Sequence, residues 1–499
     1  MDRKWRALIV VCVAIFMLLL DITVVNVALP DIQKELHTSF TDLQWVVDAY
    51  ALMLATVVLI AGSLGDLLGR KRVFTSGVVI FTAASALCGA AQSPLMLNLS
   101  RGFQGIGGGI MFAVSLAILS QEFHGKERGT AFGIWGATVG LAVAIGPLVG
   151  GALTTWAGWR WIFFVNVPIG IACVAGAIRE LHEFRDEEHG GYDIPGFVTL
   201  SAGLFLFVLA MLRGNDWHWG SARVIGLFVV AALLIVTFLL VEWRQSNPMF
   251  DVTLFRVPTF AGAQIVAFAI SSSLFAQFLY LTLYIQNVLG YSPIQAGLRF
   301  LPLSLLAFVV SPLSGRLSVR LPVRFLLGGG MALVGLALVL MHGITPSSSW
   351  TTLLAGFIVG GIGIGFVNPP LASTAVGVVP PPKAGMASGI NSTFRQVGIA
   401  TGIAALGAIL ESQVRSELAG TPAAALAKAA SAGRISVAQG QPAVEAALRS
   451  AYISGLNEVL LVGAIVCFVG AGLAFVLVRR RDFVPFRPAV EAPAAEQPA

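Results

Sequence analysis

Long apolar runs alternate with short polar segments along almost the whole chain. Most runs reach the roughly 20 residues that an α-helix needs to cross the hydrocarbon of a bilayer, so we predict fourteen spans. Their approximate ranges are 7–28, 44–64, 73–92, 95–120, 131–155, 161–178, 195–212, 222–241, 260–287, 294–315, 323–342, 351–373, 389–411 and 455–478. The first run is too long for the apolar region of a signal peptide, so it counts as the first span.

Composition excludes a water-soluble protein. Of the 499 residues, 57% are hydrophobic and only 11% are charged, against about 25% charged in an average soluble domain. The 55 glycines and 23 prolines fit membrane helices, which tolerate both residue types. The predicted fold class is therefore an all-α integral membrane protein.

Lysine and arginine are unequally divided between the two sets of connecting segments. The set that includes both termini holds 20 of the 31 basic residues and the opposite set holds 8, half of them in the long 412–454 loop. Basic residues gather in cytoplasmic loops, so we expect both termini in the cytoplasm of a bacterial-type cell (inner) membrane. This topology explains the net charge of +6 without a nucleic-acid partner.

Residues suited to metal, nucleotide or covalent chemistry are scarce. The four cysteines lie inside apolar runs, and the six histidines form no H-x-x-x-H pair. The glycine runs 105–109 and 360–365 follow no strand, and no Walker lysine is present. We therefore expect no cofactor, no metal site, no direct use of ATP and no enzyme activity.

One connecting segment combines glycines with an acid among bases. It contains Gly62, Asp66, Gly69, Arg70 and Lys71 between the second and third predicted spans. A basic cytoplasmic loop explains the bases but not the acid with the two glycines. The spacing resembles G-x-L-x-D-x-x-G-R-K, the loop signature of the major facilitator superfamily, and the resemblance implies a gate for conformational change.

Other segments also resemble this superfamily, and several resemble its fourteen-span drug:proton antiporter family. They are 20–30 in the first predicted span, 97–107 in the fourth, 159–170 and 385–398. The resemblance covers nearly the whole chain. It implies a major facilitator fold of two six-helix bundles plus two inserted helices.

The expected domains follow from that resemblance. Residues 1–180 form the first bundle, 181–258 the inserted pair with its linkers, and 259–480 the second bundle with the outer loop 412–454. The tail 481–499 is rich in proline and alanine, so we expect it to be disordered.

The fifth predicted span contains Gly146, Pro147, Gly150 and Gly151, which resemble the superfamily's antiporter motif, although Ala142 replaces its earlier glycine. Proline removes a helix hydrogen bond, so we expect a bend and close packing. One interpretation is a packing kink that has no bearing on the direction of transport. The other, which the resemblance implies, is a motif that is typical of exporters.

Asp21, Asp48 and Arg101 lie inside or at the outer third of the first, second and fourth predicted spans. A carboxylate inside a membrane is costly and marks a functional site by default. A change in the separation of such a carboxylate and an arginine would switch its proton affinity, so we predict proton coupling. For Asp21 and Arg101 the alternative is a static ion pair that only joins two helices. For Asp48 the alternative is contact with a cationic substrate.

The second half carries no Asp or Glu from Val252 through Leu410. This absence weakens a dicationic substrate. Arg299 and Arg395 lie inside spans, where they cap carbonyls, reach an interface or attract an anion. Glu411 with Arg415 fits a salt bridge at the rim.

Aromatic and amide side chains of the middle spans are candidates for a greasy substrate cavity, because they stack on amphipathic or cationic ligands. They are Trp135, Phe268, Phe275, Gln277, Phe278, Tyr280 and Tyr284. Most aromatic residues in membrane helices instead face lipid or neighbouring helices.

The predicted function is proton-driven export of lipophilic or amphipathic, often cationic, drugs by alternating access. The expected partners are small amphipathic molecules, protons and membrane lipid, and we expect a monomer. The alternatives are an exporter of lipid or of an endogenous natural product on the same scaffold, and a proton-coupled nutrient importer.

Overall fold

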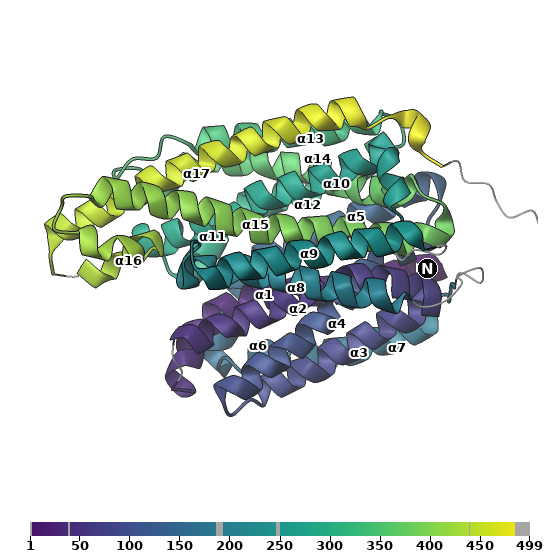
Figure 1. The fold of residues 1–499 in the computed structure, drawn as a ribbon, viewed down its shortest axis with the longest axis horizontal. Helices are drawn as coiled ribbons and strands as arrows, with labels where there is room; N and C mark the ends of the chain where they lie inside the picture. The colour runs from purple at the N-terminus through teal and green to yellow at the C-terminus, as the bar shows by residue number, and fades with distance from the viewer. Residues whose placement is uncertain (1, 38–39, 186–192, 246–249, 439, 485–499) are drawn as a thin grey trace, which may run out of the picture.

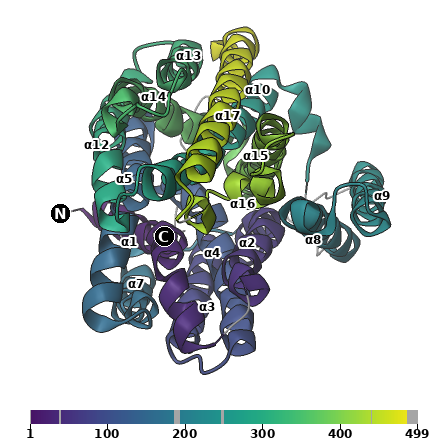
Figure 2. The same cartoon turned by 90° about the vertical axis from the view of Figure 1, so that its left-hand side faces the viewer.

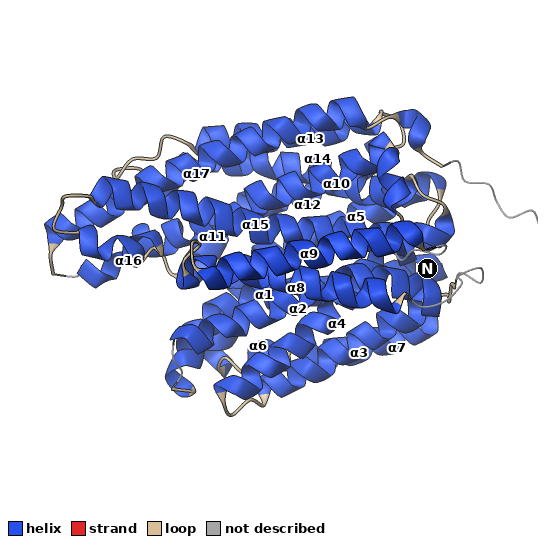
Figure 3. Cartoon of the chain, viewed as in Figure 1, coloured by secondary structure: helices blue, strands red, loops and turns tan. Residues whose placement is uncertain are grey.

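The protein is described here by a computed structural model that covers residues 2–37, 40–185, 193–245, 250–438 and 440–484. Within these ranges it contains helices and no strands. Most of the helices are long and run along one common direction (Figures 1 and 3). This arrangement satisfies the backbone within each helix, as a bilayer requires.

The first part of the chain supplies six membrane-length helical segments. These are α1 (Arg3–Glu35), α2 (Phe40–Leu68), α3 (Arg70–Gly89), α4 (Pro94–Glu122), α5 (Gly125–Ala157) and the consecutive pair α6 (Trp161–Phe164) and α7 (Asn166–Glu180). Two further helices follow, α8 (Ile194–Trp217) and α9 (Ala222–Arg244).

The second part supplies six more membrane-length segments. These are α10 (Pro258–Ile270) continued by α11 (Ala276–Leu283), α12 (Pro293–Leu317), α13 (Val323–Met341), α14 (Leu354–Gly377), α15 (Ala384–Leu418) and α17 (Pro442–Leu477), with the short α16 (Ala427–Ser431) before the last. Two π-helical stretches, Ser271–Phe275 and Tyr284–Val288, flank α11. Short 3₁₀ turns occupy Val252–Arg256, Trp350–Leu353, Pro381–Lys383, Ala424–Leu426, Ile435–Ala438 and Arg480–Asp482.

Thirteen helical segments in the described ranges are long and apolar enough to cross a membrane. The fourteenth is α5, whose 33 residues reach roughly 50 Å at 1.5 Å per residue, and it lies where the fifth span is predicted. The predicted order of fourteen helical segments is therefore present in the structure.

The two ends of the helix array are named here by what they carry. The start of α1 and the end of α17 lie together at one end, on the right of Figure 1, which we call the terminal end. The opposite end carries α6 and α16, and we call it the distal end.

Buried apolar side chains form two large cores. One is built mainly from α1 to α5 and α7, and the other from α10 to α17. Residues at the terminal ends of α14 and α15, from Ala372 to Ile390, pack into the first core. The two bundles are therefore joined at the terminal end by apolar packing.

The helices α8 and α9 lie to one side of the two bundles (Figure 2). Helix α8 packs against both α2 and α15, and a small core of Leu52, Ala55, Val208 and Ala400 joins the three. Helix α9 packs mainly on α8 and exposes Leu233, Val236 and other apolar side chains, as expected for a helix in contact with lipid.

The largest boundary difference concerns the loop predicted at 412–454. Helix α15 continues to Leu418 and α17 already begins at Pro442. Residues 442–454 consist largely of alanine and other good helix formers, with Glu445 and Arg449 one turn apart. A search for apolar spans does not detect such a polar extension of a helix.

Candidate functional site

Asp21 of α1 lies at the centre of a buried polar network. Its side chain pairs with Arg101 of α4, whose Nη1 lies 2.5 Å from the Asp21 Oδ2. The other carboxylate oxygen accepts hydrogen bonds from Gln104 Nε2 at 2.8 Å and from Asn166 Nδ2 at 3.0 Å. The Asp21 and Arg101 residues are 2% and 1% exposed, so this pair is shielded from solvent in the structure.

A second layer of contacts fixes the arginine. Arg101 Nε donates to the Val46 carbonyl of α2 at 2.9 Å, and its guanidinium lies 4.2 Å from the centre of the Tyr50 ring. The Ser85 hydroxyl of α3 accepts from both Gln104 and Asn166. Side chains from α1, α3, α4 and α7 therefore meet at one carboxylate, with α2 holding the arginine.

Gln104, Asn166 and Ser85 received no role from the sequence. The first two lie in segments that resemble family motifs, which was the available signal. Ser85 is a small hydroxyl in an apolar run, and nothing in the pattern singles it out. A hydropathy search averages over a window of about 19 residues, so it does not reveal single uncharged polar residues within an apolar run.

Asp48 pairs with the inserted helix α8. Its Oδ2 lies 3.1 Å from Arg213 Nη2, and the Arg213 guanidinium lies 4.4 Å from the centre of the Trp45 ring. The span predicted at 195–212 leaves Arg213 in the loop that follows it, but α8 continues to Trp217 and the Arg213 side chain is only 2% exposed. The predicted span ends before Arg213 because a charge normally marks the end of an apolar run. Here Asp48 neutralises that charge, so the helix continues past it.

The predicted gating loop joins the two bundles. Asp66 at the end of α2 forms a buried ion pair with Arg70 of α3, with 2.8 Å between Oδ1 and Nη2. The same carboxylate accepts from the backbone N–H groups of Gly385 at 3.1 Å and Met386 at 2.9 Å, in the first turn of α15. Arg70 also donates to the Pro381 carbonyl at 2.8 Å. Asp66 therefore contacts both the arginine of its own loop and the N-terminus of a helix that belongs to the other bundle.

Gly62 makes the close approach of α2 and α15 possible. A Cβ atom at this position would lie 2.9 Å from the Cα atom of Gly389, and it would overlap the Gly385 carbonyl oxygen. Ser388 also donates to the Ala113 carbonyl of α4. Helix α15 therefore meets α2 through backbone and α4 through the Ser388 hydroxyl.

The segment after α7 covers the outer side of this loop. The Arg70 N–H donates to the Phe184 carbonyl at 3.0 Å, and the guanidinium lies 4.4 Å from the Phe184 ring centre. Glu183 accepts from the Lys71 N–H at 3.0 Å. Gly69 has φ of +107°, where a side chain would be strained and would meet Glu183.

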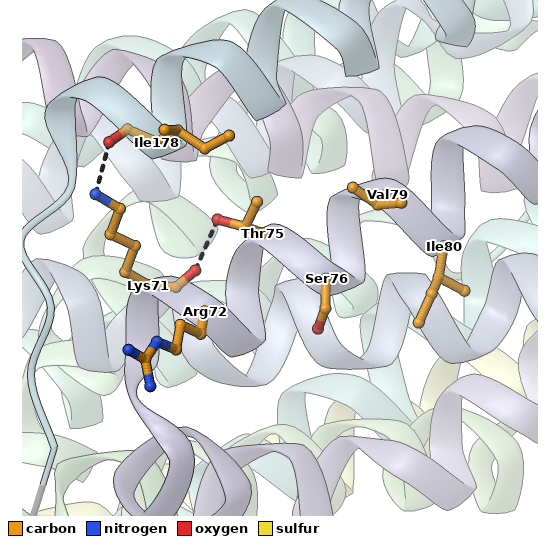
Figure 4. Close-up of a pocket in the computed structure, with 7 residues that line it drawn as sticks. All are labelled: Lys71, Arg72, Thr75, Ser76, Val79, Ile80 and Ile178. Carbon is orange, nitrogen blue, oxygen red and sulfur yellow. Dashed lines mark hydrogen bonds between the residues drawn. The ribbon is translucent and has the colours of Figure 1, made fainter.

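A shallow hollow of about 490 Å³ lies between α3 and α7 next to this loop (Figure 4). The Lys71 Nζ donates to the Ile178 carbonyl at 2.6 Å at its edge. Its lining is formed by Lys71, Arg72, Thr75, Ser76, Val79, Ile80 and Ile178. Three of the seven lining residues are aliphatic and four are charged or carry a hydroxyl group, and none belongs to the Asp21 network.

The glycines of the antiporter motif face neighbouring helices from both bundles. A Cβ atom on Gly146 would overlap the Thr23 side chain of α1, and one on Gly151 would lie 2.7 Å from Ile294 of α12. Gly150 faces Val24 of α1. Helix α5 runs unbroken from Gly125 to Ala157, and the Pro147 side chain lies outside the described part of the structure. The predicted bend stays a prediction.

Several proposed cavity residues are engaged in helix packing. Gln277 Nε2 donates to the Val459 carbonyl of α17 at 2.8 Å, and the Tyr280 hydroxyl donates to the Ile403 carbonyl of α15 at 2.5 Å. Trp135 and Tyr284 are buried. The remaining three, Phe268, Phe275 and Phe278, are partly exposed. Their role in lining a substrate cavity stays a prediction.

The sequence of residues 11–403 matches the family model of the Major Facilitator Superfamily. The chain is 33% identical over 494 residues to the tetracenomycin C resistance and export protein of Streptomyces glaucescens, covering 95% of this chain and 91% of that one. It is 36% identical over 404 residues to the multidrug resistance protein Stp of Mycobacterium tuberculosis, covering 81% and 75%.

A solved structure shares the fold at low sequence identity. The human organic anion transporter MFSD10 superimposes with a TM-score of 0.65 at 13% identity, over 95% of this chain and all of that one. Together with the multi-pass helical array and the motif residues at the bundle contacts, these matches show that the chain belongs to the Major Facilitator Superfamily of membrane transporters.

Proposed function

We propose that this protein is a proton-coupled antiporter that exports lipophilic small molecules by alternating access. The terminal end is its cytoplasmic face, in a bacterial-type inner membrane, and the protein works as a monomer. The names of its relatives, which refer to multidrug resistance and to export, support a drug exporter. The excess of basic residues beside the termini supports the orientation.

The observation that carries the proposal is the buried Asp21–Arg101 pair. In this conformation Asp21 accepts three hydrogen bonds, one of them from the Arg101 cation, and the pair is shielded from solvent. A proton added to Asp21 would deprive Arg101 of its counter-ion. Proton uptake at Asp21 therefore has to accompany a movement of α4 relative to α1, which is the link that an antiporter requires.

The contacts of Asp66 provide the second part of the proposed mechanism, which is the closing of the cytoplasmic side. They hold α2 against the first turn of α15, and the substrate path on the cytoplasmic side stays closed while they persist. Opening that side requires the bundles to separate there, as in the rocking motion of transporters with repeated halves. Alternation between the two states then exposes one central site to each side in turn.

The test is drug efflux by the purified protein in vesicles with an imposed proton gradient of either sign. Asp21→Asn keeps the shape of the side chain but removes its charge, so we expect substrate exchange to persist while its dependence on the proton gradient is lost. Glu411→Gln is the matched control, since Glu411 pairs with Arg415 at the edge of α15. Unchanged coupling in Asp21→Asn removes this residue from the mechanism.

Export of an endogenous natural product is the second candidate. The name of the Streptomyces glaucescens relative, which joins resistance to export of one compound, favours it. Competition between a host-made metabolite or a phospholipid and a dye distinguishes these substrates from foreign drugs. Accumulation of substrate inside cells would instead indicate a nutrient importer.

A further inference from the structure

Arg395 lies inside the second bundle with neutral side chains around it. The residue is 6% exposed, and its guanidinium donates to Asn368 Oδ1 at 3.3 and 3.4 Å and to Asn391 Oδ1 at 3.5 Å. These are long bonds to uncharged groups. No carboxylate pairs with Arg395 in the described part of the chain, and the sequence has none from Val252 through Leu410. Burying a cation in this setting costs free energy unless a counter-ion or stronger hydrogen bonds compensate its charge.

The amide groups around Arg395 are oriented by their contacts. The oxygen of Asn391 accepts from Arg395, and its nitrogen donates to Gln264 Oε1 at 3.1 Å. The oxygen of Asn368 also accepts from Arg395. The nitrogen atoms Asn368 Nδ2 and Gln264 Nε2 are buried and have no hydrogen-bond partner among the described residues. All three amide oxygens accept a bond. Two amide nitrogens remain as unused donors: one on Asn368, which contacts Arg395, and one on Gln264, which is linked to Arg395 through Asn391.

This cluster lies where the two bundles face each other. Gln264, Asn368 and Arg395 belong to α10, α14 and α15, and α14 and α15 contact α4 and α5 of the first bundle. Pro369 follows Asn368 directly and lies against Gly136 of α5. Arg395 is 11 residues from the start of α15, roughly 16 Å along the helix, which is about the middle of a bilayer.

Arg299 of the same half offers a contrast. It donates to the Gln295 carbonyl at 2.8 Å, and its guanidinium lies 3.4 Å from the centre of the Tyr291 ring. A hydrogen bond to a carbonyl of its own helix and ring stacking explain Arg299 locally. Arg395 makes neither a described hydrogen bond to a backbone carbonyl nor a described contact with a ring, so a structural role leaves its charge unexplained.

We propose that Arg395, Asn368 and Gln264 form a subsite for an anionic group of the exported molecule, a carboxylate or an ionised hydroxyl. The inference rests on the proposed export function and names its substrate class: lipophilic acids rather than the cations expected from the sequence. An oxyanion accepts the charge-assisted bonds of Arg395 and the free N–H groups of the two amides together. A purely cationic molecule finds no acceptor there.

The experiment compares fluorescein, an anionic xanthene dye, with rhodamine 123, a cationic dye of similar shape. Binding to the full-length protein is measured by fluorescence polarisation in an uncharged detergent, and transport is measured in phosphatidylcholine vesicles with a proton gradient. We expect Arg395→Gln to weaken fluorescein binding on the order of tenfold to a hundredfold and to leave rhodamine 123 binding unchanged. Arg299→Gln, the matched control, leaves both unchanged.

A second variant guards against a failure of Arg395→Gln to fold. Asn368→Asp places a carboxylate beside Arg395 with almost no change in shape, so the new carboxylate pairs with the Arg395 guanidinium and competes with an anionic ligand. We expect this variant to fold and to lose fluorescein binding. If Arg395 is only structural, Asn368→Asp binds fluorescein as the wild type does, and the proposal is overturned.

Other outcomes separate this inference from the proposed function. Proton-driven transport of rhodamine 123 with no fluorescein binding by the wild type overturns the anion subsite and leaves the exporter intact. Fluorescein binding that depends on Arg395 without proton-driven transport supports the subsite and removes the antiporter. Loss of wild-type fluorescein binding on addition of phosphatidylglycerol assigns the subsite to a lipid headgroup and overturns the assignment to a substrate.

Discussion

The Asp66 carboxylate and the Met386 backbone lie in different bundles, and the Met386 N–H donates to Asp66 Oδ2 at 2.9 Å. Met386 belongs to the first turn of α15, where backbone N–H groups have no partner within the helix. The positive end of the α15 dipole therefore faces a carboxylate held at the end of α2. A contact of this kind forms or breaks as a whole when the bundles separate, so it distinguishes one conformation from the other.

The first prediction concerns Asp66→Asn. The amide keeps the shape but loses the charge, so the bonds from α15 weaken and buried Arg70 loses its counter-ion. We expect the population of the conformation described here to fall by at least about tenfold. The distance between spin labels at Arg72→Cys and Arg481→Cys, exposed positions in the two bundles, reports this change.

Glu183→Gln is the control for that measurement. Glu183 contacts the same loop but lies within the first bundle's own linker, so its loss should leave the label distance unchanged. An unaltered distance in Asp66→Asn would show that the α15 contact does not set the conformation.

The second prediction uses the close approach at Gly62. Gly62→Leu places a side chain where the Gly389 Cα and the Gly385 carbonyl already lie, so α2 and α15 cannot meet. We expect the same two labels to move apart and proton-driven efflux to stop. Gly329→Leu in α13 is the matched control, because no other described helix comes within 4 Å of a Cβ there. Normal efflux by Gly62→Leu would contradict the close approach.

The third prediction concerns the anchoring of α8. Arg213→Met removes the charge that pairs with Asp48, and we expect the protein to lose about 1–3 kcal/mol of stability. Thermal unfolding in detergent measures the loss. Combining it with Asp48→Asn should cost less than the sum of the two single losses, because the residues are in contact.

Arg223→Met serves as the comparison for α8. Arg223 is exposed and lies over the Trp217 ring, so its loss should change the unfolding temperature little. Strict additivity of Arg213→Met and Asp48→Asn would show that their ion pair carries no coupling energy.

The sequence predicted much of the fold, and the reason is physical. Each apolar run has to be a helix in a bilayer, so helix order follows from hydropathy. Asp21 and Arg101 could also be predicted as partners, since two opposite charges inside one bundle have few other ways to be neutralised. Their contact is present at 2.5 Å.

Contacts between distant helices could not be predicted in the same way. Arg213 was placed in a loop because an apolar span is taken to end at a charge, and only the structure shows Asp48 beside it. Asp66 accepts hydrogen bonds from the backbone N–H groups of Gly385 and Met386. The first turn of every helix has such free N–H groups, so the sequence does not single out this one. Which helix supplies them depends on how the bundles pack.

The last prediction concerns the linker between α9 and α10, which lies outside the spans. Asp251 pairs with Lys383 at 2.8 Å, just before the first turn of α15. Burial alone would raise the pKa of the Asp251 carboxyl, but hydrogen bonds from Lys383 and Thr253 outweigh it and lower that pKa below its usual value. A carboxyl with a lowered pKa in the folded state stabilises the protein above its unfolded pKa of about 3.9, and the gain is lost as the pH falls through the folded value.

Asp251→Asn should therefore lower the unfolding temperature at pH 7 and have a smaller effect at pH 3, because the stabilisation by the carboxylate is lost as the pH falls through its lowered pKa. We expect a loss of less than about 1 kcal/mol, because Lys383 is 39% exposed and water screens the pair. Thermal unfolding in detergent at both pH values measures it, with Glu445→Gln in the loose Glu445–Arg449 pair as control. An equal loss at pH 7 and pH 3 would assign the effect to the shape of the side chain and contradict a role for its charge.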